Sequence, residues 1–487
     1  MLAESADAVT TDIPQRLDRL PWSRWHWMVV TALGVTWFLD GLEVTIVAAL
    51  GPVLTHAATL HLSASEVGLT ASAYLAGSVL GALIFSYLTD RQGRKKWFLI
   101  TLGLYLVATV LTAFSWNLAS FMCFRFLTGA GIGGEYAAIN SAVDELIPAR
   151  YRGHAGLAIN GSWWLGSAIG ALLTLVLLNP VIFPEDIGWR LCFIFGTVLG
   201  VGIALVRRAI PESPRWLMTR RRTEEAEAVV SQIERQIAET QGAWDLPAVQ
   251  EPMTLRACHA ATVATVAREL FRSYPRRTWL CLSLMITQSF LYNAVSFTFP
   301  LLLTKYYGLS AGRIGLYLLP FACGNFLGPL LLGRFFDTIG RKPMISFSYA
   351  MAGLLLGMTG YLFRQGSLTL AAHMAVWSAI FFFASAGASA AYLTVSEVFP
   401  LEIRAMAIAF FFVTAQGAAV VAPWLYGSFI ESSSTSVFYG YLLIAVMMLT
   451  GALAELLWGV KAERQPLERI AMPLSVRSRP DDLSRLD

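Results

Sequence analysis

The chain has 487 residues, of which 56% are hydrophobic and 14% charged, and its net charge is +4. A soluble domain carries about 25% charged residues, so this composition excludes a soluble protein. The five cysteines show no CxxC or Cys/His spacing, which excludes a disulfide framework and a cysteine metal site, and we expect them to be buried apolar residues.

Twelve apolar runs recur along the chain, each long enough for a bilayer core of ~30 Å, which takes about 20 residues. The first run follows a polar segment, residues 1–24, and lacks a small-residue cleavage pattern, so we expect a retained span rather than a signal peptide. The expected spans are roughly 26–51, 67–88, 97–115, 118–142, 156–178, 189–208, 278–303, 313–335, 344–363, 368–393, 405–430 and 437–460.

The first span carries two carboxylates, Asp40 and Glu43, which lie three residues apart and therefore share one helix face. A carboxylate at membrane depth is costly and marks a functional or paired group. Burial favours its protonated form and a nearby arginine favours its ionised form, so a carboxyl balanced between the two can load and release a proton.

The fourth span supplies such an arginine, Arg125, followed by Gly129, Gly133 and Ala137 at four-residue intervals. These small residues form a ridge that lets a neighbouring helix approach closely. The glycines also spell G-x-G-x-x-G, but a dinucleotide site needs a preceding strand, and here the motif lies inside an apolar helix-length run. Glu135 lies ten residues from Arg125, about 15 Å along a helix, so the two do not pair directly.

Basic residues gather in the loops on the side of the first segment, which by the positive-inside rule places both termini in the cytoplasm. They therefore report topology, and no nucleic-acid partner is needed to explain them.

A polar interval then separates the first six spans from the last six. Within it, Thr223-Glu-Glu opens a segment with apolar residues at helical spacing, which predicts an amphipathic helix. The expected divisions are 1–24 (amino-terminal segment), 25–210 (first six-helix half), 211–277 (cytoplasmic linker with short amphipathic helices), 278–461 (second half) and 462–487 (tail).

Two motifs occur in both halves at matching positions. The D-x-x-G-R-K turn after the second span begins at Asp90 and returns at Asp337, 247 residues later (337 − 90). The E-x-x-P-x-x-x-R motif after the fourth span begins at Glu145 and returns at Glu397, 252 residues later (397 − 145). Two independent repeats at nearly one offset indicate duplication, and parallel six-span halves are a transporter architecture.

These motifs resemble the signature of the major facilitator superfamily, and Pro211-Glu-Ser-Pro-Arg215 after the sixth span is similar to its sugar-and-other-metabolite branch. The resemblance covers about residues 25–470. It implies an all-α membrane protein of twelve transmembrane helices in two pseudo-symmetric halves. Two features differ from a sugar carrier. The seventh span has Gln288, Tyr292 and Asn293 where Gln-x-x-x-Gln-Gln is typical, and Asp40-Gly-Leu-Glu43 is similar to the Asp-Gly-x-Asp of proton-coupled aromatic-acid and nicotinate-type carriers.

The resemblance also implies that Glu43 lies across from Arg125. We expect Glu43 to bind the proton, Arg125 to modulate it and Asp40 to be a second candidate. The alternative is a fixed ion pair that only holds spans one and four together. Glu135 either lines the cavity or relays protons, or it lies against backbone polar groups.

We expect the charged motifs to pair across the two halves when the cavity faces outward, as a gating network that breaks and reforms between conformations. The alternative is that these charges only orient helix ends. The network consists of Asp90, Arg94, Glu145, Arg152, Glu212, Arg215, Asp337, Arg341, Glu397 and Arg404.

Polar and aromatic residues inside the spans are candidates to bind the substrate, although each one alone is more often a packing or interhelical hydrogen-bonding residue. They are Asn160, Trp163, Trp164, Gln288, Tyr292, Asn293, Asn325, Tyr392 and Gln416.

The sequence therefore predicts a secondary active transporter of a small polar metabolite in the cell membrane, working by alternating access as a proton symporter of an organic acid. The alternatives are a sugar or polyol:proton symporter, a facilitative carrier, and a carrier-like sensor. No metalloprotease, serine-nucleophile or P-loop motif is present, so we expect neither an enzyme nor a cofactor. The expected partners are a small solute, protons and lipid, with the protein a monomer.

Overall fold

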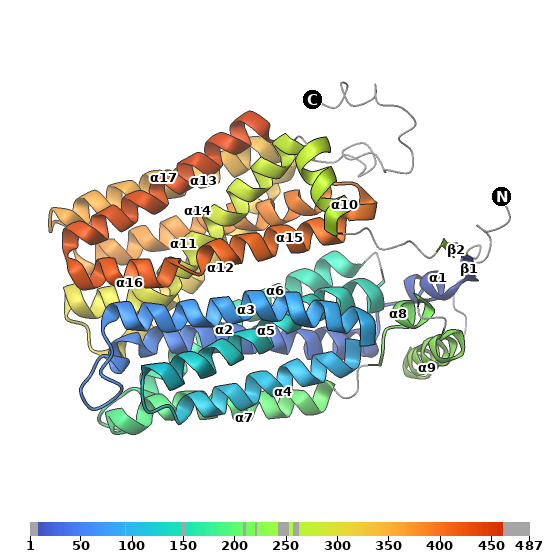
Figure 1. Cartoon of the computed structure of the whole chain (residues 1–487), viewed down its shortest axis with the longest axis horizontal. Helices are drawn as coiled ribbons and strands as arrows, with labels where there is room; N and C mark the ends of the chain where they lie inside the picture. Colours follow the sequence, from blue (N-terminus) through green and yellow to red (C-terminus); the bar gives the residue numbers. More distant parts are fainter. Residues whose placement is uncertain are drawn as a thin grey trace. The chain divides into compact units, whose positions relative to one another are not determined.

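A computed structural model describes residues 8–92, 94–148, 151–207, 211–219, 222–241, 253–256 and 263–460 (Figure 1). Almost all of this part of the chain is helical, which confirms the predicted all-α membrane fold. A helix satisfies its backbone hydrogen bonds internally, as a segment in lipid must. Nine helical segments of the described residues are long and apolar enough to cross a membrane.

The first six spans are α2 to α7, whose bounds are Arg24–Leu54, Ala64–Gln92, Arg94–Ala113, Leu118–Leu146, Arg152–Leu177 and Glu185–Arg207. The last six are α11 to α17, whose bounds are Pro275–Tyr307, Ala311–Thr338, Arg341–Arg364, Leu370–Glu397, Leu401–Ala419, Ala422–Ser432 and Ser434–Trp458. Helices α15 and α16 together form one span, so the long helices agree with the predicted twelve.

The eleventh span is broken, which the sequence analysis did not predict. Helix α15 ends at Ala419 and α16 begins at Ala422. Pro423 has no N–H to donate to the carbonyl of residue 419, and its ring would clash with that carbonyl in a regular helix. A continuous helix therefore cannot pass through this point without a kink.

The chain divides into two compact units, and their boundary cuts through several helices. The first unit comprises residues 1–44, 76–170 and 190–259. In it, α3 packs on α5 through glycines. A Cβ on Gly81 would lie 2.1 Å from the carbonyl oxygen of Ala130, and a Cβ on Gly133 would lie 2.0 Å from that of Ser78. Only glycine allows this approach, which supports the predicted small-residue ridge on the fourth span.

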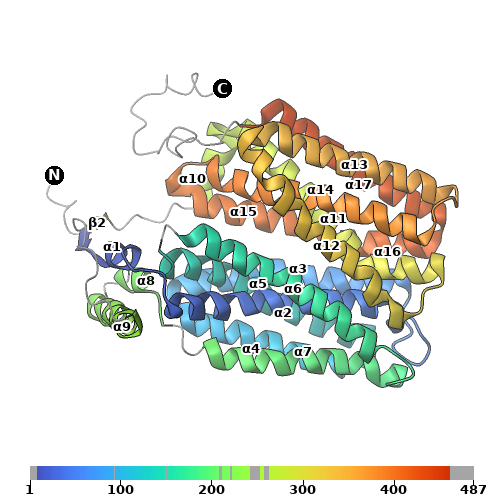
Figure 2. The ribbon, with the colours of Figure 1, turned by 180° about the vertical axis from the view of Figure 1, so that it is seen from behind.

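Helices α2 and α6 are also in backbone contact within the first unit. A Cβ on Gly41 would lie 2.0 Å from the carbonyl oxygen of Trp163, and one on Gly166 would lie 1.9 Å from that of Phe38. Helix α7 runs beside α4, with Gly200 against Leu106 (Figure 2). These contacts bring the polar side chains of α2, α4, α5 and α6 together.

The second unit comprises residues 45–75, 171–189 and 260–487. Its helices α13 and α17 lie side by side (Figure 1), with Gly360 against Tyr441 and Gly451 against Tyr349. The short helix α10 (Val263–Arg268) and a π-helical turn (Glu269–Ser273) precede α11.

This unit also contains the ends of several first-half helices, packed directly on second-half helices. Gly68 of α3 lies against the Pro423 carbonyl, where a Cβ would be 2.2 Å away, and Gly315 of α12 lies equally close to the Ala171 carbonyl of α6. The backbone N–H of Ser65 donates to Oε2 of Glu431 at 2.9 Å. Segments of both sequence halves therefore pack against each other within this unit.

The linker forms α8 (Pro214–Thr219) and α9 (Thr223–Gln241), and the second of these confirms the predicted amphipathic helix. Two features were not predicted. The amino-terminal segment forms a short helix, α1 (Ile13–Asp18), and the strands β1 (Ala8–Thr11) and β2 (Met253–Arg256) pair antiparallel.

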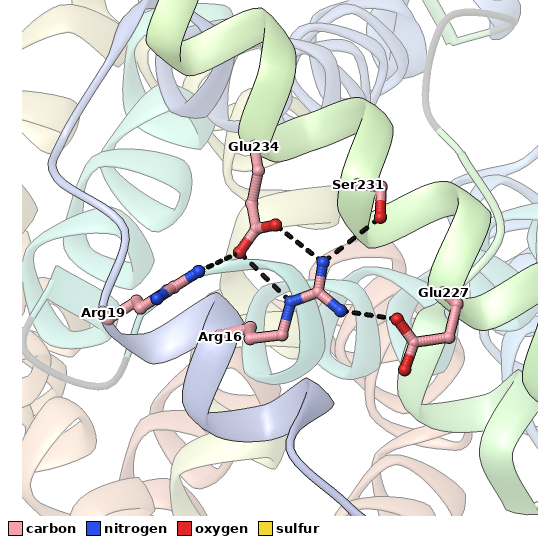
Figure 3. Close-up of polar contacts among 5 residues, drawn as sticks. All are labelled: Arg16, Arg19, Glu227, Ser231 and Glu234. Atoms are coloured by element: carbon pink, nitrogen blue, oxygen red, sulfur yellow. Dashed lines mark hydrogen bonds and ion pairs between the residues drawn. The ribbon is translucent and has the colours of Figure 1, made fainter. Parts of the chain in front are cut away.

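Helix α1 is held on α9 by charged and apolar contacts (Figure 3). Arg16 donates to Glu234 at 2.6 and 3.2 Å and to Glu227 at 2.5 Å, and Arg19 donates to Glu234 at 2.7 Å. The apolar side of the contact is fully buried and consists of Ile13, Leu17, Leu20, Ala226, Val230, Ile233 and Ile237.

Candidate functional site

A buried ion pair lies in the first unit. Nη1 of Arg125 on α5 donates to Oε1 of Glu43 on α2, and the side chains are 0% and 5% exposed. On α4, the hydroxyl of Thr109 donates to Oε2 of Glu43 at 3.5 Å. The structure thus places Glu43 across from Arg125, as the resemblance implied.

Two further buried carboxylates and a buried tyrosine lie in the same unit as this pair. Nε1 of Trp163 on α6 donates to Oδ2 of Asp40 at 2.8 Å. Tyr105 on α4 interacts electrostatically with Glu43, Asp40 and Glu135. Asp40 and Glu135 are only 4% and 1% exposed. We call Asp40, Glu43, Arg125, Glu135, Tyr105, Thr109 and Trp163 the acid–arginine cluster.

Tyr105 and Thr109 were missed in the sequence. They lie four residues apart and so share one face of α4, but this spacing is common on apolar helices. Only the contact of α4 with α2 and α5 identifies them.

The ionisable side chains of the acid–arginine cluster are almost completely buried. An arginine remains protonated under all ordinary conditions, so its partner Glu43 is the group that can change charge. While Glu43 is ionised the pair is neutral overall.

The second unit holds uncharged polar groups. The hydroxyl of Tyr292 on α11 donates to Oδ1 of Asn325 on α12 at 2.6 Å, and Nδ2 of Asn325 donates to the Phe321 carbonyl at 3.0 Å. The hydroxyl of Ser385 on α14 donates to the Asn325 carbonyl at 2.7 Å. These bonds join three helices around the fully buried Asn325.

A second uncharged group joins α11 to α15. Nδ2 of Asn293 donates to Oε1 of Gln416 at 3.2 Å, and Ser289, which was not predicted, donates to the same oxygen at 2.5 Å. Together with Tyr292 and Asn325, these residues form the amide cluster.

The remaining substrate candidates lie apart from these bonds. Gln288 is 4% exposed and donates to the sulfur of Met285 at 3.3 Å, whereas Tyr392 is 46% exposed. Trp163 and Trp164 meet edge to face, with ring centroids 4.5 Å apart. The side chain of Asn160 lies outside the described residues.

The structure describes three side chains of the predicted gating network. Arg341 and Glu397 form an ion pair, 10% and 16% exposed, within the second half. Glu212 accepts from the backbone N–H of Lys95 at 3.2 and 3.3 Å. The side chains of Asp90, Arg94, Glu145, Arg152, Arg215, Asp337 and Arg404 lie outside the described part of the chain.

Comparison with known proteins agrees with this architecture. A family model described as Sugar (and other) transporter matches residues 27–469. The chain is 26% identical to the niacin transporter NiaP of Acinetobacter baylyi over 416 residues, which cover 85% of this chain and 89% of the relative. It is 32% identical to the putative metabolite transport protein YyaJ of Bacillus subtilis over 350 residues, 71% of this chain and 74% of the relative.

Among solved structures, the fold matches a partially occluded inward-open conformation of the xylose transporter XylE from Escherichia coli. The TM-score is 0.71 at 17% identity, covering 91% of this chain and 100% of that chain.

Proposed function

Because the chain belongs to the Sugar (and other) transporter family of the major facilitator superfamily, we propose that it is a proton-coupled symporter of a small organic acid. It is a membrane transporter and not an enzyme. Proton coupling and the acid substrate are the proposed part, and the observation that carries them is the buried contact of Arg125 with Glu43.

The coupling follows from charge balance. In the empty carrier, ionised Glu43 neutralises Arg125. When Glu43 takes a proton, the guanidinium is left as a buried cation, which is costly unless an anion replaces the carboxylate. A monocarboxylate solute supplies that anion, and the planar guanidinium binds it bidentately. The proton and the solute then enter together with no net charge, so transport is electroneutral.

The acidic solute is also favoured by the groups available to bind it. Sugars are bound through many hydroxyl-to-amide hydrogen bonds, but Gln288 is turned toward Met285 and the amide cluster has few amides. The aromatic surface of Trp163 and Trp164 suits a flat acid. The relative NiaP is named as a niacin transporter, and niacin is a flat aromatic carboxylate. A sugar:proton symporter is the second candidate, because the matched structure is a xylose transporter.

Alternating access needs contacts between halves that can open and close. Gly68 and Gly315 provide such contacts at one end. The repeated charged motifs are the proposed network at the other end, which we place in the cytoplasm with both termini. The Arg341–Glu397 pair lies within the second half and is not itself a contact between the halves. We place the protein in the cell membrane as a monomer.

Uptake by proteoliposomes tests the proposal. Nicotinate, benzoate, xylose and glucose are offered with and without an imposed pH gradient, and with the membrane potential clamped or varied. We expect a monocarboxylate to accumulate with the pH gradient, to bind more tightly as the pH falls from neutral to mildly acidic, and to respond little to the potential. Tight hexose binding that is indifferent to pH would overturn the proposal in favour of the sugar carrier.

A further inference from the structure

Among the residues that the structure describes, a histidine and a glutamate are almost completely buried in the second half of the chain, outside the amide cluster. His373 on α14 is 0% exposed and Glu455 on α17 is 1% exposed. Their surroundings differ completely, and that difference shows which of them can exchange a proton.

His373 is held as a neutral ring. Nε1 of Trp377 can only donate, and it donates to Nε2 of His373 at 2.8 Å, so Nε2 is an acceptor and the ring proton lies on Nδ1. Nδ1 lies 2.8 Å from the hydroxyl oxygen of Tyr307, which accepts a hydrogen bond from it. With both nitrogens occupied, a second proton on the ring would require these bonds to break. His373 is therefore structural.

Glu455 has the opposite environment. Neither of its carboxyl oxygens has a hydrogen-bond partner among the residues that the structure describes. An ionised carboxylate without partners is very costly to bury, whereas a neutral carboxyl at the same place costs far less. The geometry therefore favours Glu455 carrying a proton in this conformation.

The groups around Glu455 come from α13 and α11. Lys342 on α13 interacts electrostatically with Glu455. Both side chains also lie close to Gly459, because a Cβ on Gly459 would be 2.6 Å from Oε1 of Glu455 and 2.9 Å from Cγ of Lys342. Glu455 also interacts electrostatically with Tyr349 of α13 and with Cys281 of α11. The hydroxyl of Tyr349 is occupied, since it donates to the Leu284 carbonyl at 3.1 Å. Arg277 at the start of α11 donates to the Val398 carbonyl at 2.9 Å.

A further polar atom lies at the same level. The contacts Gly360–Tyr441, Gly451–Tyr349 and Gly459–Lys342 fix the antiparallel register of α13 and α17. This register places Ser346 opposite Glu455, one turn from Lys342 on the same face of α13. The hydroxyl oxygen of Ser346 is also buried without a hydrogen-bond partner among the described residues.

Lys342 belongs to the repeated turn between α12 and α13. It directly follows Arg341, which is ion-paired with Glu397, and it follows Gly340, whose φ is 115°. A backbone at this φ is readily adopted only by glycine. A change in the position of this turn moves Lys342 relative to Glu455.

We propose that Glu455 is a second proton-binding site, protonated in this conformation and ionised when Lys342 moves to pair with it. The site adds regulation to the proposed function: proton binding at Glu455 sets the position of the α12–α13 turn, and so the rate of conformational exchange, while Glu43 couples the proton to the solute.

Infrared spectroscopy of the purified full-length protein tests proton binding directly, without any need for transport. The spectrum of the protein is recorded as the pH is raised, and the loss of the protonated-carboxyl C=O band is followed. We expect a band that persists in Glu43→Gln and is absent from Glu455→Gln. Glu431→Gln is the control, because the Glu431 carboxylate accepts from Ser65 and should not contribute to this band. An unchanged band in Glu455→Gln would overturn the proposal.

Solute exchange in proteoliposomes tests the regulation. With the internal pH varied at constant external pH, the wild-type exchange rate should change, and this change should be smaller in Glu455→Gln, where only the pH response through Glu43 remains. Lys342→Met should shift the infrared transition to higher pH, because the ionised form loses its cation. A wild-type pH response in Glu455→Gln would contradict the regulatory role. Because Glu455→Gln should still accumulate solute with the pH gradient, failure of this proposal is distinct from failure of the coupling at Glu43.

Discussion

The two halves of the chain carry different chemistry at positions that the internal repeat relates. The offset of 252 residues between Glu145 and Glu397 also relates Arg125 of α5 to Trp377 of α14 (377 − 125). Both side chains are almost completely buried, at 0% and 1% exposed. Arg125 is the cation of an ion pair, whereas Trp377 is a neutral donor to His373 and Tyr441.

Positions 125 and 377 thus share burial and hydrogen bonding but differ in charge. The acid–arginine cluster contains three carboxylates and a guanidinium, whereas the amide cluster contains no acidic or basic side chain of this kind. We therefore expect the coupling of the proton to the carboxylate solute to depend on the acid–arginine cluster, and recognition of uncharged parts of the solute to depend on the amide cluster. Each prediction below changes one side of this comparison.

Removal of Arg125 should have the largest effect, because it leaves Glu43 buried without its cation. Arg125→Gln should lower the free energy of unfolding by about 3–5 kcal/mol and abolish accumulation. The double variant Arg125→Gln/Glu43→Gln should regain most of the stability but no accumulation.

Trp377→Phe, at the related position, should lower the free energy of unfolding by about 1–3 kcal/mol, because its hydrogen-bond partners are left unsatisfied, and should leave the pH dependence of uptake unchanged. Unfolding of the purified variants and proteoliposome uptake measure both quantities, and a loss of pH dependence in Trp377→Phe would contradict the comparison.

A second prediction concerns the contacts that join the halves within the second unit. A Cβ on Gly315 would lie 2.2 Å from the Ala171 carbonyl oxygen, whereas a Cβ on Gly333 of the same helix would meet nothing within 4 Å. Gly315→Ala should destabilise the closed contact by about 1–3 kcal/mol and slow transport without weakening solute binding much. Gly333→Ala is the matched control, and equal transport rates in the two variants would show that this contact does not limit closure.

The amide cluster should affect affinity but not coupling. Tyr292→Phe removes the donor of the 2.6 Å hydrogen bond to Asn325 and should weaken solute binding by about 1 kcal/mol, or about fivefold. The pH dependence of uptake should remain that of the wild type. Tyr361→Phe, at a tyrosine 56% exposed on α13, is the control. A changed proton-to-solute ratio in Tyr292→Phe would mean that the second half also handles protons from the solute site.

The smallest effect is expected at the contact of α1 with α9. Burial alone would raise the pKa of Glu234, but its hydrogen bonds to Arg16 and Arg19 outweigh this and lower the pKa below the ordinary 4.5. The contact is therefore fully stabilised above about pH 4.5 and weakens as the pH falls through the lowered pKa. Glu234→Gln should weaken it by about 0.2–1 kcal/mol. Hydrogen exchange of α1 measures this, and Glu224→Gln at the exposed start of α9 is the control. Unchanged exchange in Glu234→Gln would show that the apolar contacts alone hold α1.

Much of the fold could be predicted because lipid imposes a simple rule on composition. Each long helix needs about 20 apolar residues, so the spans are visible as runs, and the repeated charged motifs mark their ends. Arg125 and Glu43 were predictable for the same reason, since a charge inside a span is conspicuous.

Other features depend on contacts that no local pattern carries. Tyr105, Thr109 and Ser289 look like ordinary helix residues until their partners are known. Helix α1 and strand β1 are too short to show periodicity, and they are stabilised by the distant segments α9 and β2. Glu455 lies near the end of its span, where the sequence predicts a solvent-exposed acid at the membrane surface. Only the structure shows that its side chain is buried.

The Glu43→Gln variant tests the central claim most directly. In proteoliposomes with an imposed pH gradient, the carboxylate that the wild type accumulates should not be accumulated by Glu43→Gln, because the variant has no carboxyl to carry the proton beside Arg125. Exchange of internal for external solute should continue, since Arg125 remains available to bind it. Wild-type accumulation in Glu43→Gln would contradict the assignment of proton coupling to this pair.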